Sequence, residues 1–203
     1  MKRIIIGLTG GIGGGKSEVR RILENLGCLG IDADKISKEI LNSGEEPANK
    51  VIQRFGNRIL QNPSETEPQK QIINRSELAK IVFSNQRELS WLESLIYPIL
   101  FERIDRTIEQ NSDRSIVIEA IKLYDCCLNE LCNQIWLVTA PEEIRAIRLS
   151  EKRHMTKEDA LMRIRAQDQI DWHMDRANAV IDSQIPLEDM QIQVKKLWNS
   201  LMK

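Results

Sequence analysis

The feature that most constrains this chain is a glycine-rich segment near its N-terminus, residues 10–17, which read GGIGGGKS. An apolar, β-branched run precedes it at residues 4–9, and apolar residues follow between residues 19 and 26 with the spacing of one helix face. The order therefore predicts a buried strand, a glycine loop and a helix. The alternative is a plain glycine-rich turn, which the full pattern in this context disfavours.

The loop fits the pattern G-x-x-x-x-G-K-[ST] of a phosphate-binding loop (P-loop), with Gly10, Gly15, Lys16 and Ser17 at the fixed positions. Glycines allow positive φ angles and a close approach of amide N–H groups to an anion, and the helix dipole is directed at the same point. Lys16 can reach the β- and γ-phosphates of a nucleotide, and the Ser17 hydroxyl can coordinate Mg²⁺.

Size and charge set broad limits. The chain has 203 residues, 41% of them hydrophobic and 29% charged, which is typical of a globular protein with one α/β domain and a small subdomain. A net charge of −1 does not favour nucleic-acid binding. Residues 4–9 are too short an apolar run for a signal sequence or a membrane span, so no membrane partner is expected.

The cysteines do not indicate a zinc site or a disulfide framework. Cys28, Cys126, Cys127 and Cys132 form no C-x-x-C pair, and the chain has only two histidines. We therefore expect a cytoplasmic protein with free thiols, either a monomer or a weak homo-oligomer.

Two acidic residues follow the second predicted strand. Residues 28–31 form a short apolar run, and Asp32 and Asp34 come directly after it. Ligands of open parallel sheets bind outside the carboxyl ends of the strands, which is also where the P-loop begins. If the backbone stays extended, the two carboxylates point the same way. The alternative is that they cap and begin the next helix.

A third acidic residue, Glu119, ends the predicted strand at residues 115–118. P-loop proteins place an acid near Mg²⁺ at such a position, and the alternative is a surface acid at a strand end. Further strands are predicted at residues 134–140 and 179–181, with helices between the strands. This alternation predicts a parallel sheet with helices on both faces.

The remaining segments divide into a core, an insertion and a lid. The core comprises about residues 1–34, 111–141 and 177–203, and the helical insertion about residues 35–110, where Pro98 is expected to end one helix and start another. About residues 142–170 form two basic helices joined by a short link. Their arginines, with Arg148 as our candidate, can close over a nucleotide and neutralise a transferring phosphate. A basic solvated surface is the alternative.

A P-loop alone indicates nucleotide binding and not a reaction. A GTPase should carry an N-K-x-D motif, but residues 49–52 read NKVI and lack the acid. A small chain with an early acid pair and a basic lid fits phosphoryl transfer to a small alcohol or phosphate. Asp34 is then a candidate to receive the proton of the acceptor.

The sequence resembles the dephospho-CoA kinase family at residues 7–17 and at Ile31-Asp32-Ala33-Asp34. The similarity covers nearly the whole chain. The resemblance implies a P-loop kinase core, a helical domain that helps to hold the coenzyme A precursor, and a lid. It also implies transfer of the γ-phosphoryl group of ATP to the ribose 3′-hydroxyl of dephospho-CoA, with ATP and Mg²⁺ as the cofactors.

Residue roles follow from the motif and the resemblance together. Asp34 would be the base, Lys16 and Arg148 would act on the transferring phosphoryl group, and Ser17 and Glu119 would hold the metal. Asp32, Asp34 and Tyr97 would contact the acceptor. The expected ATP contacts are Gly11, Gly13, Gly14, Gly15, Lys16, Ser17 and Glu18.

Several positions differ from the residues usual in the family. This chain has Gly14 where Ser is usual, Glu18 where Thr or Ser is usual, Tyr97 in place of His, residues 119–122 in place of a Pro-Leu-Leu run, and Ser183 in place of Asn. Because Lys16, Ser17 and Asp34 are unchanged, we expect an active enzyme. Two alternatives remain. One is a kinase for a nucleoside monophosphate or a small sugar acid, and the other is a catalytically silent nucleotide-binding paralogue.

Overall fold

The computed structural model describes residues 3–42, 44–61, 71–153, 155–165, 167 and 174–203. The chain forms two compact units. One combines Met1–Asp32 with Asp105–Lys203 and contains the sheet, and the other is Ala33–Ile104. The helical insertion was predicted at residues 35–110, so its predicted end lies beyond the boundary of the second unit.

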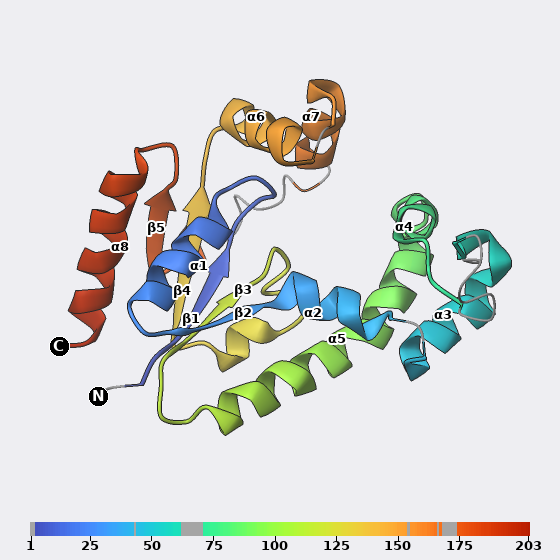
Figure 1. The fold of residues 1–203 in the computed structure, drawn as a ribbon, viewed down its shortest axis with the longest axis horizontal. Coiled ribbons are helices and arrows are strands. Elements are labelled where there is room, and N and C mark those ends of the chain that lie inside the picture. The colour runs from blue at the N-terminus through green and yellow to red at the C-terminus, as the bar shows by residue number, and fades with distance from the viewer. Residues whose placement is uncertain (1–2, 43, 62–70, 154, 166, 168–173) are drawn as a thin grey trace, which may run out of the picture. The chain divides into compact units, whose positions relative to one another are not determined.

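A parallel sheet organises the first unit (Figure 1). The strands are β1 (Ile5–Thr9), β2 (Leu29–Asp32), β3 (Ile116–Glu119), β4 (Gln134–Thr139) and β5 (Ala179–Asp182). They pair in the order β2-β3-β1-β4-β5, and all four pairings are parallel. The predicted fold class, an α/β fold of the P-loop kinase type, is confirmed.

Helices α1 (Lys16–Asn25) and α8 (Leu187–Leu201) cover one face of this sheet. Leu23, Trp136 and Trp198 share one buried cluster there, so β4 and both helices have a common core. On the other face, a Cβ at Gly7 would lie 2.8 Å from the Sγ of Cys132 and from a methyl group of Leu123. The segment after β3, with the 3₁₀ helix η2 (Leu128–Leu131), therefore packs directly on β1.

Helices α6 (Glu142–Arg153) and α7 (Lys157–Arg165) follow β4 at the carboxyl end of the sheet (Figure 1). They correspond to the predicted pair of basic helices. The Oγ1 of Thr156 accepts a hydrogen bond of 3.1 Å from the backbone N–H of Asp159 and so caps the second helix.

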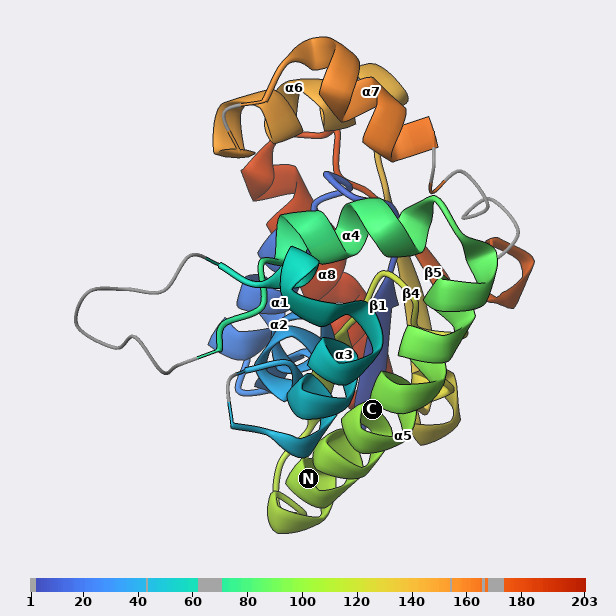
Figure 2. The ribbon, with the colours of Figure 1, turned by 90° about the vertical axis from the view of Figure 1, so that its right-hand side faces the viewer.

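The second unit is helical (Figure 2). It contains α2 (Ala33–Ile40), α3 (Glu46–Phe55), the 3₁₀ helix η1 (Gly56–Ile59), α4 (Arg75–Phe83) and most of α5 (Gln86–Gln110). Arg54 of α3 donates hydrogen bonds of 2.6 and 3.2 Å to Glu88 of α5, and these bonds hold the pKa of that carboxyl below its ordinary value. The Arg54 guanidinium also lies 4.3 Å from the ring centroid of Trp91, which joins α3 to α5.

The predicted break at Pro98 is wrong, because α5 continues through it as one helix. Pro98 is exposed, so its ring faces outward. The buried residues continue at intervals of four on both sides of it, at Leu92, Ile96, Leu100, Ile104 and Ile108. Burial of this continuous apolar stripe outweighs the backbone hydrogen bond that a proline removes. Residues 62–70, before α4, lie outside the described residues.

Within the described ranges, the structure has no helix whose length and apolar content would suffice to cross a membrane.

The four cysteines differ sharply in exposure, and this difference predicts their reactivity. Cys127 is exposed, whereas burial raises the pKa of Cys28 to about 11 and that of Cys132 to about 12. Since the thiolate is the reactive species, we expect Cys127 to react first with a maleimide at pH 8. Cys127→Ser should remove the fast phase and Cys28→Ser should keep it. A fast phase that survives in Cys127→Ser would contradict the structure.

Candidate functional site: a phosphate-binding loop between β1 and α1

The loop between β1 and α1 has a backbone that requires glycine. The φ angles are +140° at Gly10, +75° at Gly13 and +92° at Gly15, a range that other residues rarely adopt. A Cβ at Gly10 would overlap the carbonyl oxygen of Val138, and one at Gly15 would lie 2.7 Å from the Cβ of Ser183. The predicted order of strand, loop and helix is confirmed, and the loop lies tightly against its neighbours.

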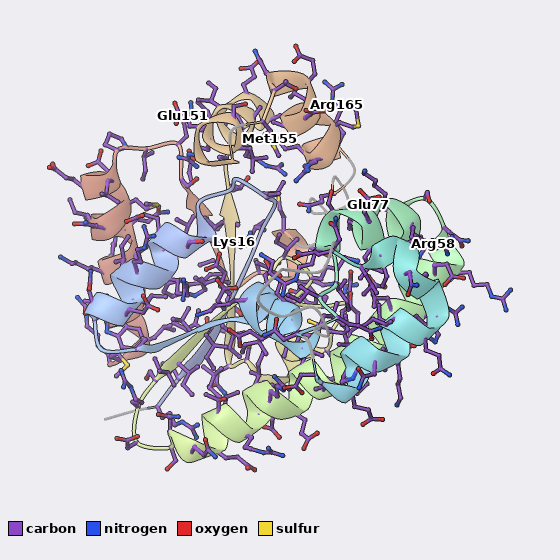
Figure 3. All side chains as sticks on the ribbon, turned by 45° about the vertical axis from the view of Figure 1, so that its right-hand side comes forward. Lys16, Arg58, Glu77, Glu151, Met155 and Arg165 are labelled. Atoms are coloured by element: carbon purple, nitrogen blue, oxygen red, sulfur yellow. The ribbon has the colours of Figure 1, made fainter. Side chains whose placement is uncertain are left out.

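Lys16 is the first residue of α1 and is only 6% exposed (Figure 3). Its Nζ donates hydrogen bonds of 2.9 Å to the carbonyl of Gly10 and 3.1 Å to that of Gly11. The side chain therefore folds back over the loop and holds a positive charge inside the turn. A positive charge at this position suits a polyphosphate.

The loop also contacts two arginines of α6. Arg145 donates from Nε to the carbonyl of Ile12 at 2.9 Å, and Arg148 donates from Nη1 to the carbonyl of Gly13 at 3.3 Å. The predicted lid arginine Arg148 thus lies beside the loop. Sequence reasoning did not assign Arg145 to the site, although it belongs to the same basic helix.

Ser183, which follows β5, contacts both the loop and α6. Its hydroxyl donates to the carbonyl of Gly14 at 2.8 Å and accepts from Nη1 of Arg148 at 2.7 Å. Nη2 of Arg148 also donates to the Ser183 carbonyl at 2.6 Å. Sequence reasoning noted Ser183 only as a departure from the family pattern, and it gave no signal of this contact.

Arg165, at the end of α7, pairs with an acidic residue of α6. The Nε of Arg165 donates to Oε1 of Glu142 at 2.9 Å, which joins the end of α7 to the start of α6 (Figure 3). This pair fits the solvated-surface alternative for Arg165. The side-chain oxygen of Gln167, just after α7, accepts from the backbone N–H of Ile12 at 3.1 Å.

Ser17 and Glu119 lie together beside the loop. The Ser17 hydroxyl donates to Oε1 of Glu119 at 2.7 Å, and Glu119 is only 6% exposed. β3 lies between β1 and β2, with Glu119 opposite Leu8 on one side and Asp32 on the other. The register of the sheet therefore brings the carboxylate to the edge where the P-loop begins.

Arg20 is a partner of three carboxylates at this edge. Its Nε donates to Oε2 of Glu119 at 2.9 Å, and its Nη1 donates to Glu24 at 3.3 Å. Its Nη2 lies 4.0 Å from a carboxylate oxygen of Asp32. Arg20 thus offsets the charge of the buried Glu119, and sequence reasoning missed it because an arginine one turn into a helix is usually solvated.

The oxygen atoms of Ser17 and Glu119 fit a magnesium ion by their chemistry. Mg²⁺ prefers oxygen ligands, and in nucleotide sites it takes one or two from the protein and the rest from phosphate and water. A hydroxyl and a carboxylate oxygen 2.7 Å apart at the start of α1 satisfy that requirement. Glu18, in the same first turn, pairs instead with Nη1 of Arg21 at 3.0 Å.

Asp34 lies in a helix and not in an extended segment. β2 ends at Asp32 and α2 begins at Ala33, so the condition for two parallel carboxylates at positions 32 and 34 is not met. Asp34 is half-buried in the first turn of α2, within the helical unit. Tyr97 is also half-buried there, on α5. Their predicted roles toward the acceptor stay predictions.

Comparison with known proteins identifies the family. The family model described as dephospho-CoA kinase matches residues 4–189. The chain belongs to the dephospho-CoA kinase family. A dephospho-CoA kinase from Carboxydothermus hydrogenoformans is 37% identical over 193 residues, which cover 94% of this chain and 90% of that protein. One from a Synechococcus strain is 36% identical over 193 residues, covering 95% and 94%.

The fold agrees with a solved structure as well. A crystal structure from Thermus thermophilus matches with a TM-score of 0.80 and 25% identity, and the match covers 99% of each chain. As a member of the dephospho-CoA kinase family, the chain is an ATP-dependent phosphotransferase. The P-loop, Lys16 and the Ser17–Glu119 pair all lie in its sheet unit.

The ion pair between Arg20 and Glu119 gives a test of this site. Arg20→Ala leaves a nearly buried carboxylate without its charged partner, so we expect the free energy of unfolding to fall by about 3 kcal/mol. Arg20→Ala/Glu119→Gln should recover most of that loss because the amide is neutral. Urea unfolding followed by tryptophan fluorescence, to which the buried Trp136 contributes, measures both.

Arg21→Ala is the matched control, since this arginine is exposed and its pair with Glu18 is worth at most about 1 kcal/mol. The assigned pairing would be contradicted if Arg20→Ala had the free energy of unfolding of the wild type. It would also be contradicted if the double variant were no more stable than Arg20→Ala.

Proposed function

We propose that this chain transfers the γ-phosphoryl group of ATP to the ribose 3′-hydroxyl of dephospho-CoA, giving coenzyme A and ADP. The observation that carries the proposal is a P-loop with a folded-back Lys16, in a chain whose residues 4–189 match the dephospho-CoA kinase family. Phosphoryl transfer needs little covalent chemistry from a protein, and it depends mainly on positioning and on stabilising charge.

The sheet unit binds the triphosphate. The loop residues Gly11, Gly13, Gly14 and Gly15 and the N-terminus of α1, including Ser17 and Glu18, surround the phosphates. Lys16 supplies a positive charge from the loop, and Arg148 supplies a second from α6. Both charges favour the transition state, in which negative charge spreads over the transferring group.

Ser17 and Glu119 hold Mg²⁺ together with the phosphates, and their oxygens at 2.7 Å support this assignment. When bound there, the ion would supply positive charge that offsets the negative charge of the phosphates. Arg20 keeps the Glu119 carboxylate directed at Ser17, because it occupies the other carboxylate oxygen at 2.9 Å.

Asp32, Asp34 and Tyr97 contact the acceptor, the last two from the helical unit. Asp34 acts as the general base. The 3′-oxygen attacks the γ-phosphorus, the bond from that phosphorus to the bridging oxygen of ADP breaks, and the hydroxyl proton passes to Asp34. We further propose a cytoplasmic monomer or weak homo-oligomer that has a small-molecule substrate and no nucleic-acid or membrane partner.

An acceptor panel tests the function. With ATP and Mg²⁺, we expect ADP release with dephospho-CoA and none with nucleoside monophosphates, shikimate or gluconate. Release with one of the other acceptors alone would replace the proposal with a different small-molecule kinase. ATP binding without turnover on any acceptor would support a catalytically silent paralogue.

Asp34→Asn tests the base. We expect kcat with dephospho-CoA to fall about 100-fold while ATP binding measured by calorimetry is unchanged, because only the proton acceptor is lost. Asp113→Asn, an exposed acid in the loop before β3, is the matched control and should keep full turnover. Normal turnover of Asp34→Asn would remove Asp34 from this role.

A further inference from the structure

All the backbone carbonyls of the P-loop accept hydrogen bonds, although they differ in their donors. The Nζ of Lys16 donates to the carbonyls of Gly10 and Gly11, and the backbone N–H of Glu18 donates to the carbonyl of Gly15 at 3.0 Å. The three carbonyls between them have side-chain donors from elsewhere in the sheet unit. These are Arg145 for Ile12 at 2.9 Å, Arg148 for Gly13 at 3.3 Å and Ser183 for Gly14 at 2.8 Å.

The direction of a carbonyl fixes the direction of the next amide. A trans peptide is planar, so its N–H points away from its C=O. Holding the Ile12 and Gly14 carbonyls toward Arg145 and Ser183 therefore turns the N–H groups of Gly13 and Gly15 away from those side chains. An anion cradle needs its N–H groups turned inward and its carbonyl oxygens turned away from the negative charge.

We propose that Arg145, Arg148 and Ser183 are positioning residues. They hold carbonyl oxygens of the P-loop away from the anion site, so that N–H groups of the loop point toward it. This proposal rests on the proposed function in taking the triphosphate of ATP as the anion. It gives Arg148 a task that precedes nucleotide binding, beside any charge it lends to the transferring phosphoryl group.

The Ser183 hydroxyl links Arg148 to the loop. A guanidinium can only donate, so the hydroxyl accepts from Arg148 and its single proton goes to the Gly14 carbonyl. The Ser183 side chain has little freedom, because it is 2% exposed and its backbone N–H donates to the carbonyl of Thr139 at 2.9 Å. Ser183 after β5 and Arg148 of α6 thus hold neighbouring carbonyls of the loop, those of Gly14 and Gly13.

The Ser183 hydroxyl can be tested without changing the charge of the site. Ser183→Ala removes the donor to Gly14, and we expect ATP to bind about tenfold more weakly, measured by calorimetry without acceptor. Asparagine is the residue usual here in the family, and its side chain offers both a donor and an acceptor. Ser183→Asn should therefore bind ATP about as tightly as the wild type. In turnover assays, Ser183→Ala should raise the KM for ATP and leave the KM for dephospho-CoA unchanged.

Ser150→Ala is the matched control. Ser150 lies on α6, and in the described part of the chain its buried Oγ has no hydrogen-bond partner. Ser150→Ala should bind ATP like the wild type. If Ser183→Ala fails to fold, Ser183→Cys replaces it, because the thiol keeps the volume with a weaker donor and should lower ATP affinity to an intermediate value.

The proposal is overturned if Ser183→Ala, or Ser183→Cys where Ser183→Ala fails to fold, binds ATP within about twofold of the wild type. It is equally overturned if Ser183→Asn fails to restore binding. A weaker ATP affinity of Ser183→Ala together with no turnover of dephospho-CoA by the wild type would uphold the loop proposal and overturn only the proposed function.

Discussion

The site depends on one constraint, which is that a short backbone segment must turn its amides toward an anion while its carbonyls find donors elsewhere. Positive φ angles at Gly10, Gly13 and Gly15 make the turn possible, but they do not decide which way each peptide faces. That choice is made by the side chains that hold the carbonyls. The glycines allow several backbone conformations, and the hydrogen bonds from Lys16, Arg145 and Ser183 to the loop carbonyls select one of them.

The sheet explains why these partners meet. Since β1 is central and pairs with both β3 and β4, residues that follow all three strands arrive at one edge. Glu119 ends β3 beside the loop, and the chain after β4 leads into α6. The same register makes Arg20 necessary, because a carboxylate that is only 6% exposed needs a cation to offset its desolvation.

The elements and the P-loop were predictable because their signals are local. The apolar runs, the glycine pattern and the cap at Thr156 lie within a few residues of the structures they specify. Arg145 and Ser183 were not predictable in the same way, since their loop partners are 133 and 169 residues away in the chain. At Pro98 a local rule failed, because an apolar stripe continued past the residue that should have ended the helix. At Asp34 the sequence left open an extended segment or the start of a helix, and α2 begins at Ala33.

Phosphorus NMR of the purified chain with ATP, Mg²⁺ and dephospho-CoA tests the central claim most directly. We expect the γ-phosphate resonance to be replaced by one new phosphomonoester resonance, coupled to the ribose 3′ proton of the acceptor. Lys16→Met should leave the ATP spectrum unchanged. Formation of inorganic phosphate alone, or of a monoester at any other position, would contradict the account.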